Sequence, residues 1–231
     1  MVKMLNIIRM SKNDIKKLKL VKNGNCGTTS KVYKLNDKEC IKVFNNSMDE
    51  FDLYRMNRFT KMSFEGANLP KVLVLINNKF KASIMDYING EMLSELTSIE
   101  YSTFIRLANE LVQNVKVISK EGIRIFDSHA ENIMYNYDTG KLVLTDPGEW
   151  SFDTLNTKEE ITRKNFELIN SSIRGHLFLA DSYLPSCFYI PNLVDISVDD
   201  DFIDYYEDLK EKIEKTKNVK IKTILDSRRY M

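Results

Sequence analysis

Cysteine and histidine, the residues that build disulfide scaffolds and zinc sites, are scarce in this sequence. It contains three cysteines and two histidines among 231 residues, and no two cysteines form a Cys-x-x-Cys pair. An odd cysteine count without such pairs argues against a disulfide framework, and so few histidines argue against structural zinc. We therefore expect a reducing, cytoplasmic location.

Glycine, proline and long apolar runs are also few. Eight glycines and four prolines exclude a collagenous or low-complexity chain. No stretch approaches the ~18 apolar residues of a membrane-spanning helix. The apolar start of the chain is followed by lysines rather than by a small-residue cleavage site, so we predict neither a membrane span nor a signal peptide.

The charge is balanced, with 34 basic and 33 acidic side chains and a net charge of +1. This balance does not favour a polyanion-binding surface, and no nucleic-acid partner is expected. Hydrophobic residues make up 43% of the chain, enough for a real core. At roughly 150 residues per domain, the length allows one large domain or two small lobes.

Alternating apolar and polar residues predict two β-hairpins in the first part of the chain. The first joins residues 31–35 to residues 40–44. The second joins residues 71–76 to residues 80–88 through the turn Asn77-Asn78. Two further short strands are predicted later, at residues 132–137 and 141–145.

Helices are predicted where a Ser or Thr is followed three residues later by Glu, the pattern of a capping box. The three boxes are Ser47–Glu50, Thr97–Glu100 and Thr157–Glu160. The expected helices run to about residue 62, to just before Gly122 and to about residue 174. A fourth helix is expected over residues 199–217, which begin acidic and end basic.

These elements predict an α+β protein with two lobes. A strand-rich N-terminal lobe spans residues 1–88, and a mainly helical C-terminal lobe spans residues 89–231, with a hinge over residues 86–90. A cleft between two lobes is a common place for a ligand.

The first hairpin carries residues suited to binding phosphate. The loop from Asn25 to Ser30 consists of small residues, which let backbone amides approach a phosphate closely. Lys42 shares a face of the predicted sheet with Val32 and Cys40, so its charge needs an anion. Glu50 is a candidate partner. An ordinary turn, a surface lysine and a helix-capping glutamate remain the simpler alternatives.

A second group of polar residues follows two predicted strand boundaries. Asp127 lies five residues before Asn132, directly ahead of an apolar strand, and Asp146-Pro147-Gly148 ends the next strand. Such oxygen ligands suit Mg²⁺ better than zinc. Each residue alone could serve a cap or a turn, but the ordered set points to chemistry.

With these residues the sequence resembles the protein-kinase-like superfamily over about residues 20–150. That family has a Gly-rich loop, a strand lysine, a helix glutamate, an Asp and Asn in the catalytic loop, and an Asp-Phe-Gly segment. The matching segments here are Asn25-x-Gly27-x-x-Ser30-x-Val32, Cys40-Ile41-Lys42, Glu50, Asp127 through Asn132, and Asp146-Pro147-Gly148.

The resemblance implies a role for each of these residues in ATP- and Mg²⁺-dependent phosphoryl transfer. Lys42, positioned by Glu50, would hold phosphates, and Asp127 would orient or deprotonate the acceptor hydroxyl. Asn132 and Asp146 would bind Mg²⁺. The remaining implied nucleotide contacts are Asn25, Gly27 and Ser30 in the loop, Val32, Cys40 and Met134 around the adenine, and the backbone of Asp86 and Ile88.

Several positions depart from the family pattern. Phe126 replaces the arginine before the catalytic Asp, so control through that arginine is not expected. His129 stands where protein kinases usually carry Lys, and aminoglycoside- and choline-type kinases carry His in a similar position. Only residues 149–156 separate Gly148 from the Thr157 cap, which leaves little room for a peptide-docking segment.

The leading functional prediction is therefore a protein Ser/Thr kinase, which would take ATP and a protein hydroxyl as substrates. Small-molecule kinase is the first alternative, and His129 and the short segment favour it. A pseudokinase that only binds partners is the second. Against that second alternative counts the presence of Lys42, Asp127, Asn132 and Asp146.

Overall fold

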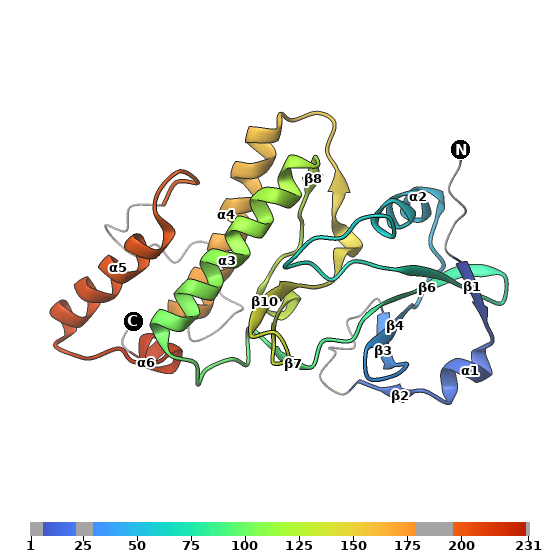
Figure 1. Cartoon of the computed structure of the whole chain (residues 1–231), viewed down its shortest axis with the longest axis horizontal. Helices are drawn as coiled ribbons and strands as arrows, with labels where there is room; N and C mark the ends of the chain where they lie inside the picture. Colours follow the sequence, from blue (N-terminus) through green and yellow to red (C-terminus); the bar gives the residue numbers. More distant parts are fainter. Residues whose placement is uncertain (1–6, 22–29, 179–195, 230–231) are drawn as a thin grey trace. The chain divides into compact units, whose positions relative to one another are not determined.

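The computed structural model describes residues 7–21, 30–178 and 196–229. Its internal contacts divide the chain into two compact units, drawn in Figure 1. The first unit comprises residues 1–89 together with residues 145–148, and the second comprises residues 90–144 and 149–231. The chain thus leaves the first unit after Asn89 and returns to it briefly at Thr145.

The first unit is built on a six-stranded sheet with the order β1-β5-β6-β4-β3-β2. β1 lies parallel to β5, and every other pair of neighbours is antiparallel. The strands are β1 (Ile7–Met10), β2 (Lys19–Leu20), β3 (Ser30–Lys34), β4 (Glu39–Phe44), β5 (Val72–Ile76) and β6 (Lys79–Asp86).

Both predicted hairpins of this sheet are confirmed. β3 pairs with β4, and β5 pairs with β6. Asn77 and Asn78 turn the second hairpin with φ values of 53° and 60°. Asparagine tolerates this left-handed conformation better than most residues, and two consecutive positive φ angles match the right-handed twist of the flanking strands.

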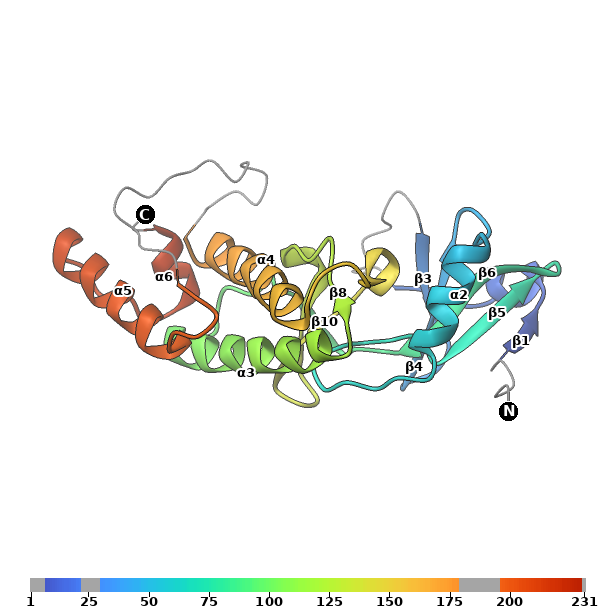
Figure 2. The same ribbon diagram turned by 90° about the horizontal axis from the view of Figure 1, so that it is seen from above.

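Two helices lie on opposite sides of this sheet, α1 (Lys12–Lys16) and α2 (Glu50–Phe59), as Figures 1 and 2 show. The predicted start of α2 is wrong. Asp49, not Ser47, is its N-cap and accepts a hydrogen bond from the Asp52 amide. The reason lies in the sheet, because the Met48 amide donates to the Phe80 carbonyl and holds the chain extended there.

The two faces of the sheet differ in character. One face carries the apolar core of the unit, formed by Ile15 of α1 with strand residues that share an aliphatic side chain: Ile41, Val74, Ile76, Ala82 and Ile84. The other face carries Lys42, which pairs in register with Ser83, and Ser83 pairs with Leu73. Antiparallel partners lie on the same face, so Lys42 is surrounded by buried neighbours.

The second unit is mainly helical, with α3 and α4 packed side by side (Figures 1 and 2). Its helices are α3 (Tyr101–Lys120), α4 (Lys158–Phe178), α5 (Phe202–Lys217) and α6 (Ile224–Arg229). Its strands are β7 (Gly90–Met92), β8 (Ile123–Arg124), β9 (Ile133–Asn136), β10 (Lys141–Leu144) and β11 (Ser151–Phe152). Short 3-10 turns occur at η1 (Ala130–Asn132) and η2 (Pro147–Glu149).

Strand pairing in the second unit gives two small antiparallel sheets. The predicted pairing of the two late strands is confirmed in a sheet of order β10-β9-β7, and β8 pairs with β11. Gly90 of β7 approaches β9 so closely that an added Cβ atom would lie 1.8 Å from the Tyr135 carbonyl oxygen. Only glycine fits there.

The predicted helix starts in this unit have mixed outcomes. The Thr157–Glu160 capping box is confirmed, since each side chain bonds the other residue's amide. The Thr97–Glu100 box is wrong, because α3 starts at Tyr101. The Thr97 carbonyl accepts from Leu225, and Glu100 bridges to Thr223, so this segment pairs with the region around α6 and cannot be helical. Asp201 caps α5.

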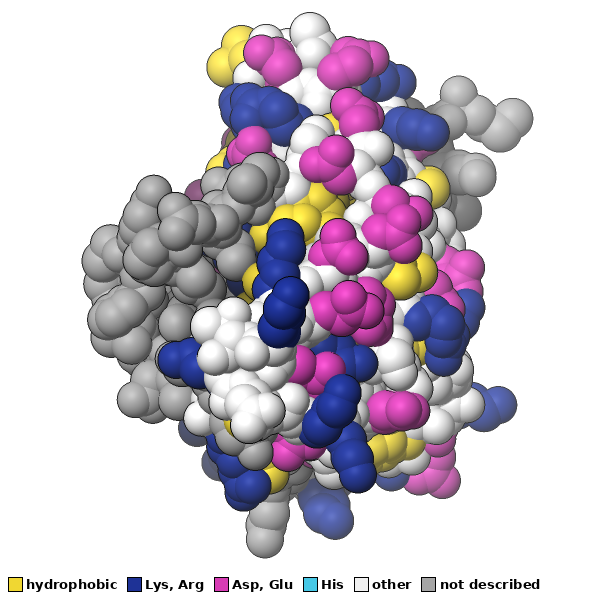
Figure 3. Space-filling view, turned by 90° about the vertical axis from the view of Figure 1, so that its left-hand side faces the viewer, with side chains coloured by type: hydrophobic (Ala, Val, Ile, Leu, Met, Phe, Trp, Pro, Cys, Tyr) yellow, Lys and Arg dark blue, Asp and Glu magenta, His cyan; other side chains and the backbone are white. Residues whose placement is uncertain are grey.

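Taken together, the described residues form a mixed α+β protein with an antiparallel-rich sheet, as predicted. Figure 3 shows the face of the molecule at which α5 lies. Acidic and basic side chains are interspersed over its coloured surface. This face therefore has no single-sign charge of the kind that marks a polyanion-binding surface. Within the described ranges, no helix is both long and apolar enough to span a membrane.

Candidate functional site

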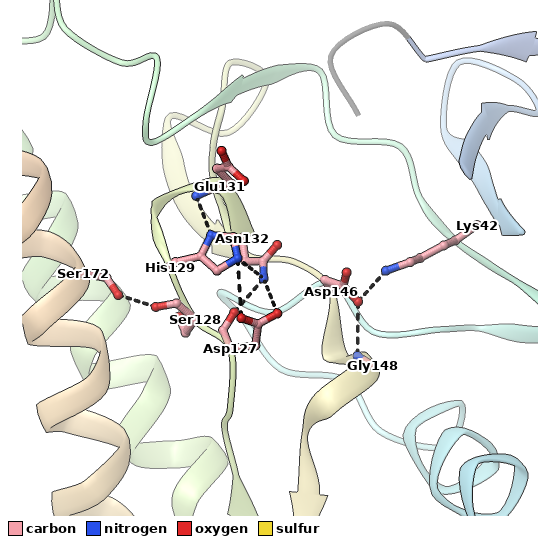
Figure 4. A network of polar contacts seen from close by, with 9 residues as sticks. All are labelled: Lys42, Asp127, Ser128, His129, Glu131, Asn132, Asp146, Gly148 and Ser172. Atoms are coloured by element: carbon pink, nitrogen blue, oxygen red, sulfur yellow. Dashed lines mark hydrogen bonds and ion pairs between the residues drawn. The ribbon is translucent and has the colours of Figure 1, made fainter. Parts of the chain in front are cut away.

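In the first unit, the buried Lys42 forms an ion pair with the partly exposed Asp146 (Figure 4). The Lys42 side chain is 8% exposed and the Asp146 side chain 37%. The contact between Lys42 Nζ and Asp146 Oδ1 compensates a charge that burial would otherwise destabilise strongly. The ring of Phe44 lies 5.7 Å from Nζ and adds an aromatic face to the surroundings of the ammonium group.

The backbone at Asp146 is shaped to present its carboxylate. Asp146 has a φ of 55°, a left-handed conformation that is uncommon outside glycine. Its Oδ1 also accepts from the Gly148 amide at 3.3 Å, and a Cβ atom on residue 148 would lie 3.0 Å from that oxygen. The turn therefore needs a small residue at position 148.

The expected pair between Lys42 and Glu50 is not formed. Glu50 is the first residue of α2 and is exposed, whereas Lys42 is buried against Asp146. The predicted capping box makes Glu50 the third residue of its helix. Because the helix starts two residues later than that box requires, Glu50 is its first residue, and the predicted position of Glu50 is wrong.

In the second unit, Asp127 and Asn132 are joined directly (Figure 4). Asn132 Nδ2 donates to the Asp127 carbonyl oxygen at 2.6 Å and lies 3.4 Å from Asp127 Oδ2. Asp127 also has a φ of 55°. Non-glycine residues in this conformation persist only where their surroundings hold them, and they cluster at functional sites.

His129 completes this loop. Its Nδ1 accepts from the Glu131 amide at 3.3 Å, which caps η1. Its Nε2 lies 3.5 Å from Asp127 Oδ1 and 3.3 Å from Asn132 Nδ2. The ring therefore contacts both polar side chains of this loop.

α4 anchors the chain on both sides of Asp127. Asn165 is fully buried, and its Oδ1 accepts from the Ile125 amide at 2.9 Å and from Arg124 at 2.8 Å. Its Nδ2 donates to the Ile123 carbonyl and to Ser119. Two turns further along the helix, the Ser172 hydroxyl donates to the Ser128 carbonyl.

The predicted nucleotide-binding residues of the first unit are partly described. Asn25 and Gly27, and Cys26 between them, lie outside the described residues. Ser30 is buried at the start of β3, and Val32 pairs in register with Lys42. Cys40 is buried on β4. Burial, and secondarily Asp86, raise the pKa of its thiol to about 12, so it is a protonated hydrogen-bond donor.

The Asp86 carbonyl is already occupied. It accepts from Asn68 Nδ2 at 2.9 Å and from Cys40 Sγ at 3.4 Å. A carbonyl oxygen has two lone pairs, so a nucleotide base at this carbonyl has to displace one donor. Ile88 is buried in the first unit, and Met134 lies on β9 of the second. Their contact with adenine stays a prediction.

The sequence analysis missed Asn165 and Ser172, although a signal for one was present. Ile161, Asn165, Ile169 and Ile173 recur every four residues on α4, so Asn165 is a polar residue inside an apolar stripe. A polar side chain placed there must be satisfied by buried partners. No comparable pattern marks Ser172.

No protein-family model matches the chain. A search of curated proteins returns no match either. The functional argument therefore depends on the residues and geometry described above.

Proposed function

We propose that this chain is an ATP- and Mg²⁺-dependent phosphotransferase that moves the γ-phosphoryl group to a hydroxyl, with protein Ser or Thr as the first acceptor class. The observation that carries the proposal is the ion pair between the buried Lys42 and Asp146. A lysine and a carboxylate from distant parts of the sequence meet at the two positions where the kinase resemblance implies phosphate and metal ligands.

The chemistry of the side chains fits the implied ligands. Mg²⁺ is usually held by one or two protein oxygen ligands, with water and phosphate oxygens completing the shell. Asp146 Oδ2 accepts no hydrogen bond among the described residues, and the same holds for Asn132 Oδ1, since Asn132 bonds Asp127 through its amide nitrogen. Both oxygens are suited to a hard cation.

The chain's own residues would divide the work of transfer. Bound Mg²⁺ supplies charge neutralisation of the phosphates. Lys42 would hold phosphate oxygens, and Asp127 would accept or orient the proton of the acceptor hydroxyl. His129 and Asn132 keep the Asp127 carboxylate and its backbone in place.

A small-molecule acceptor is the second candidate, favoured by two observations. After η2 the chain enters β11, which pairs with β8, and α4 follows at Lys158. Little of this segment is left to dock a peptide. His129, at the position that carries His in aminoglycoside- and choline-type kinases, points the same way.

The test is incubation of the full chain with Mg²⁺ and γ-labelled ATP, alone, with a protein mixture, and with amino sugars or choline. We expect label on one acceptor class, and loss of transfer in a folded Asp146→Asn variant. Melting temperatures with and without Mg-ATP check binding. Binding without transfer to any acceptor, water included, supports the pseudokinase alternative, and absence of binding at millimolar Mg-ATP overturns the proposal.

A further inference from the structure

The backbone around Asp127 is held at three successive points. The Ile125 amide is bonded by Asn165, the Asp127 carbonyl by Asn132, and the Ser128 carbonyl by Ser172. The first two holds come from amide side chains. The third comes from a single hydroxyl, on the C-terminal side of the left-handed residue.

Ser172 can make this bond in only one way at a time. Its hydroxyl has one proton and two carbonyl acceptors nearby, Ser128 in the loop and Leu168 on its own helix at 3.1 Å. Serine in a helix normally bonds its own i−4 carbonyl. Here the Ser128 carbonyl is the nearer acceptor, so the bond to the loop competes with the bond within the helix.

Few other groups could replace this bond. Ser128 is 4% exposed, so water does not readily reach it, and its own hydroxyl has no partner within the described residues. Without the Ser172 proton, the buried carbonyl between Ser128 and His129 has no donor, which is unfavourable, so this peptide is driven to rotate. Its rotation moves His129, whose Nε2 lies 3.5 Å from Asp127 Oδ1, and disturbs the turn that holds Asp127 in its left-handed conformation.

We infer that Ser172 is a positioning residue for Asp127, and that its hydroxyl sets the direction of the Asp127 carboxylate through the Ser128 carbonyl. This inference rests on the proposed phosphotransferase function. Ser172 touches no reacting atom, so its removal should lower the rate of transfer without changing nucleotide binding.

The test compares three variants of the full chain, with Mg-ATP and water as the acceptor. Ser172→Ala removes the hydroxyl and Ser172→Thr keeps it. Ser171→Ala is the matched control, since Ser171 is the neighbouring, exposed serine of the same helix. We expect kcat to fall about tenfold in Ser172→Ala with KM for ATP unchanged, and both other variants to stay near the parent.

A second readout needs no activity. In ¹⁵N-labelled protein, the amide resonances of Asp127 and Ser128 should move in Ser172→Ala and stay in place in Ser171→Ala. If Ser172→Ala does not fold, Ser172→Cys, a weaker donor, takes its place and should show the same changes at smaller size.

Three results overturn the inference. One is a kcat per folded molecule in Ser172→Ala within twofold of that of Ser171→Ala, with only the melting temperature lowered. Another is an equal loss in Ser172→Thr, and the third is unmoved Asp127 and Ser128 resonances. If the parent neither binds Mg-ATP nor transfers phosphoryl, the proposed function fails, and the resonances alone then decide whether Ser172 places Asp127.

Discussion

The two histidines of the chain lie in opposite environments within the same unit. His129 sits in the loop after β8 with its side chain 50% exposed, beside Asp127. His176 sits in the last turn of α4 and is 4% exposed. Its Nε2 lies 2.9 Å from the Leu96 carbonyl, and its Nδ1 contacts the Arg228 guanidinium.

The surroundings of His176 commit it to one protonation state. Burial, and next the Arg228 charge, lower its pKa to about 3. The neutral ring donates from Nε2 to Leu96 and accepts at Nδ1 from Arg228, so both nitrogens are satisfied. His176 thus joins α4 to α6, while His129 is exposed to solvent beside Asp127. The same residue type is fixed in the core at one place and left accessible at the other.

The largest expected effect comes from a substitution of Asp127, the carboxylate beside the exposed His129. Asp127→Asn keeps the shape of the side chain and removes the charge, so transfer should fall roughly 10²–10⁴-fold with ATP affinity unchanged. Asparagine tolerates the left-handed backbone at this position, so folding should be little affected. Rapid-quench transfer rates, nucleotide affinity and melting temperature measure the three quantities.

A purely structural role for Asp127 predicts the reverse pattern. The melting temperature would then drop, and turnover per folded molecule would stay the same. Transfer within twofold of the parent in the folded variant excludes Asp127 as the group that handles the acceptor proton.

The second largest effect concerns the buried His176, which should make the folded chain less stable in acid. Because the pKa of His176 is near 6.5 unfolded and about 3 folded, only the unfolded chain takes up this proton between those values. Stability is therefore complete above pH 6.5 and falls as the pH drops, by about 1.4 kcal/mol per pH unit. Denaturant unfolding at pH 7 and pH 5 should differ by about 2 kcal/mol from this residue.

The matched control is His176→Gln. Glutamine is neutral at both pH values, so this variant should be less stable than the parent at pH 7 and should lose less stability on going to pH 5. An equal loss in parent and variant would show that other groups cause the pH dependence. Ordinary carboxylates titrate below pH 5, so they contribute little to a stability difference measured between pH 7 and pH 5.

These comparisons also separate what local sequence patterns predict from what they miss. The hairpin turned by Asn77 and Asn78 was predictable, since alternation and turn chemistry act between neighbours. The cap at Asp49 was not, because a contact between Met48 and Phe80 decides where α2 begins. A capping pattern indicates where a helix can start, but long-range pairing can move that start.

The candidate site shows the same limit. Asp127 and Asn132 are five residues apart, and their predicted closeness follows from a tight loop. The partner of Lys42 is chosen across the fold: a nearby Glu50 is left exposed, and distant Asp146 takes the charge. No local sequence pattern predicts that Lys42 pairs with Asp146, and none predicts the bond from Ser172 to Ser128.

The smallest expected effect concerns His129 itself and separates the two contacts that its ring makes. Its ring both caps η1, through Nδ1, and faces the Asp127 carboxylate, through Nε2. Asparagine is a good N-cap and can still accept from the Glu131 amide, but its side chain is too short to reach Asp127 as the ring does. His129→Asn therefore removes orientation alone, and His129→Ala removes orientation and cap together.

We expect His129→Asn to lower the transfer rate about three- to tenfold at an unchanged melting temperature. His129→Ala should lower the rate at least as much and also lower the melting temperature, because a lost cap costs about 0.5–2 kcal/mol. Transfer rates and thermal unfolding scans of the two variants measure these changes. If His129→Asn transfers phosphoryl as fast as the parent, the ring only caps η1, and His129 is then as structural as His176 despite its exposure.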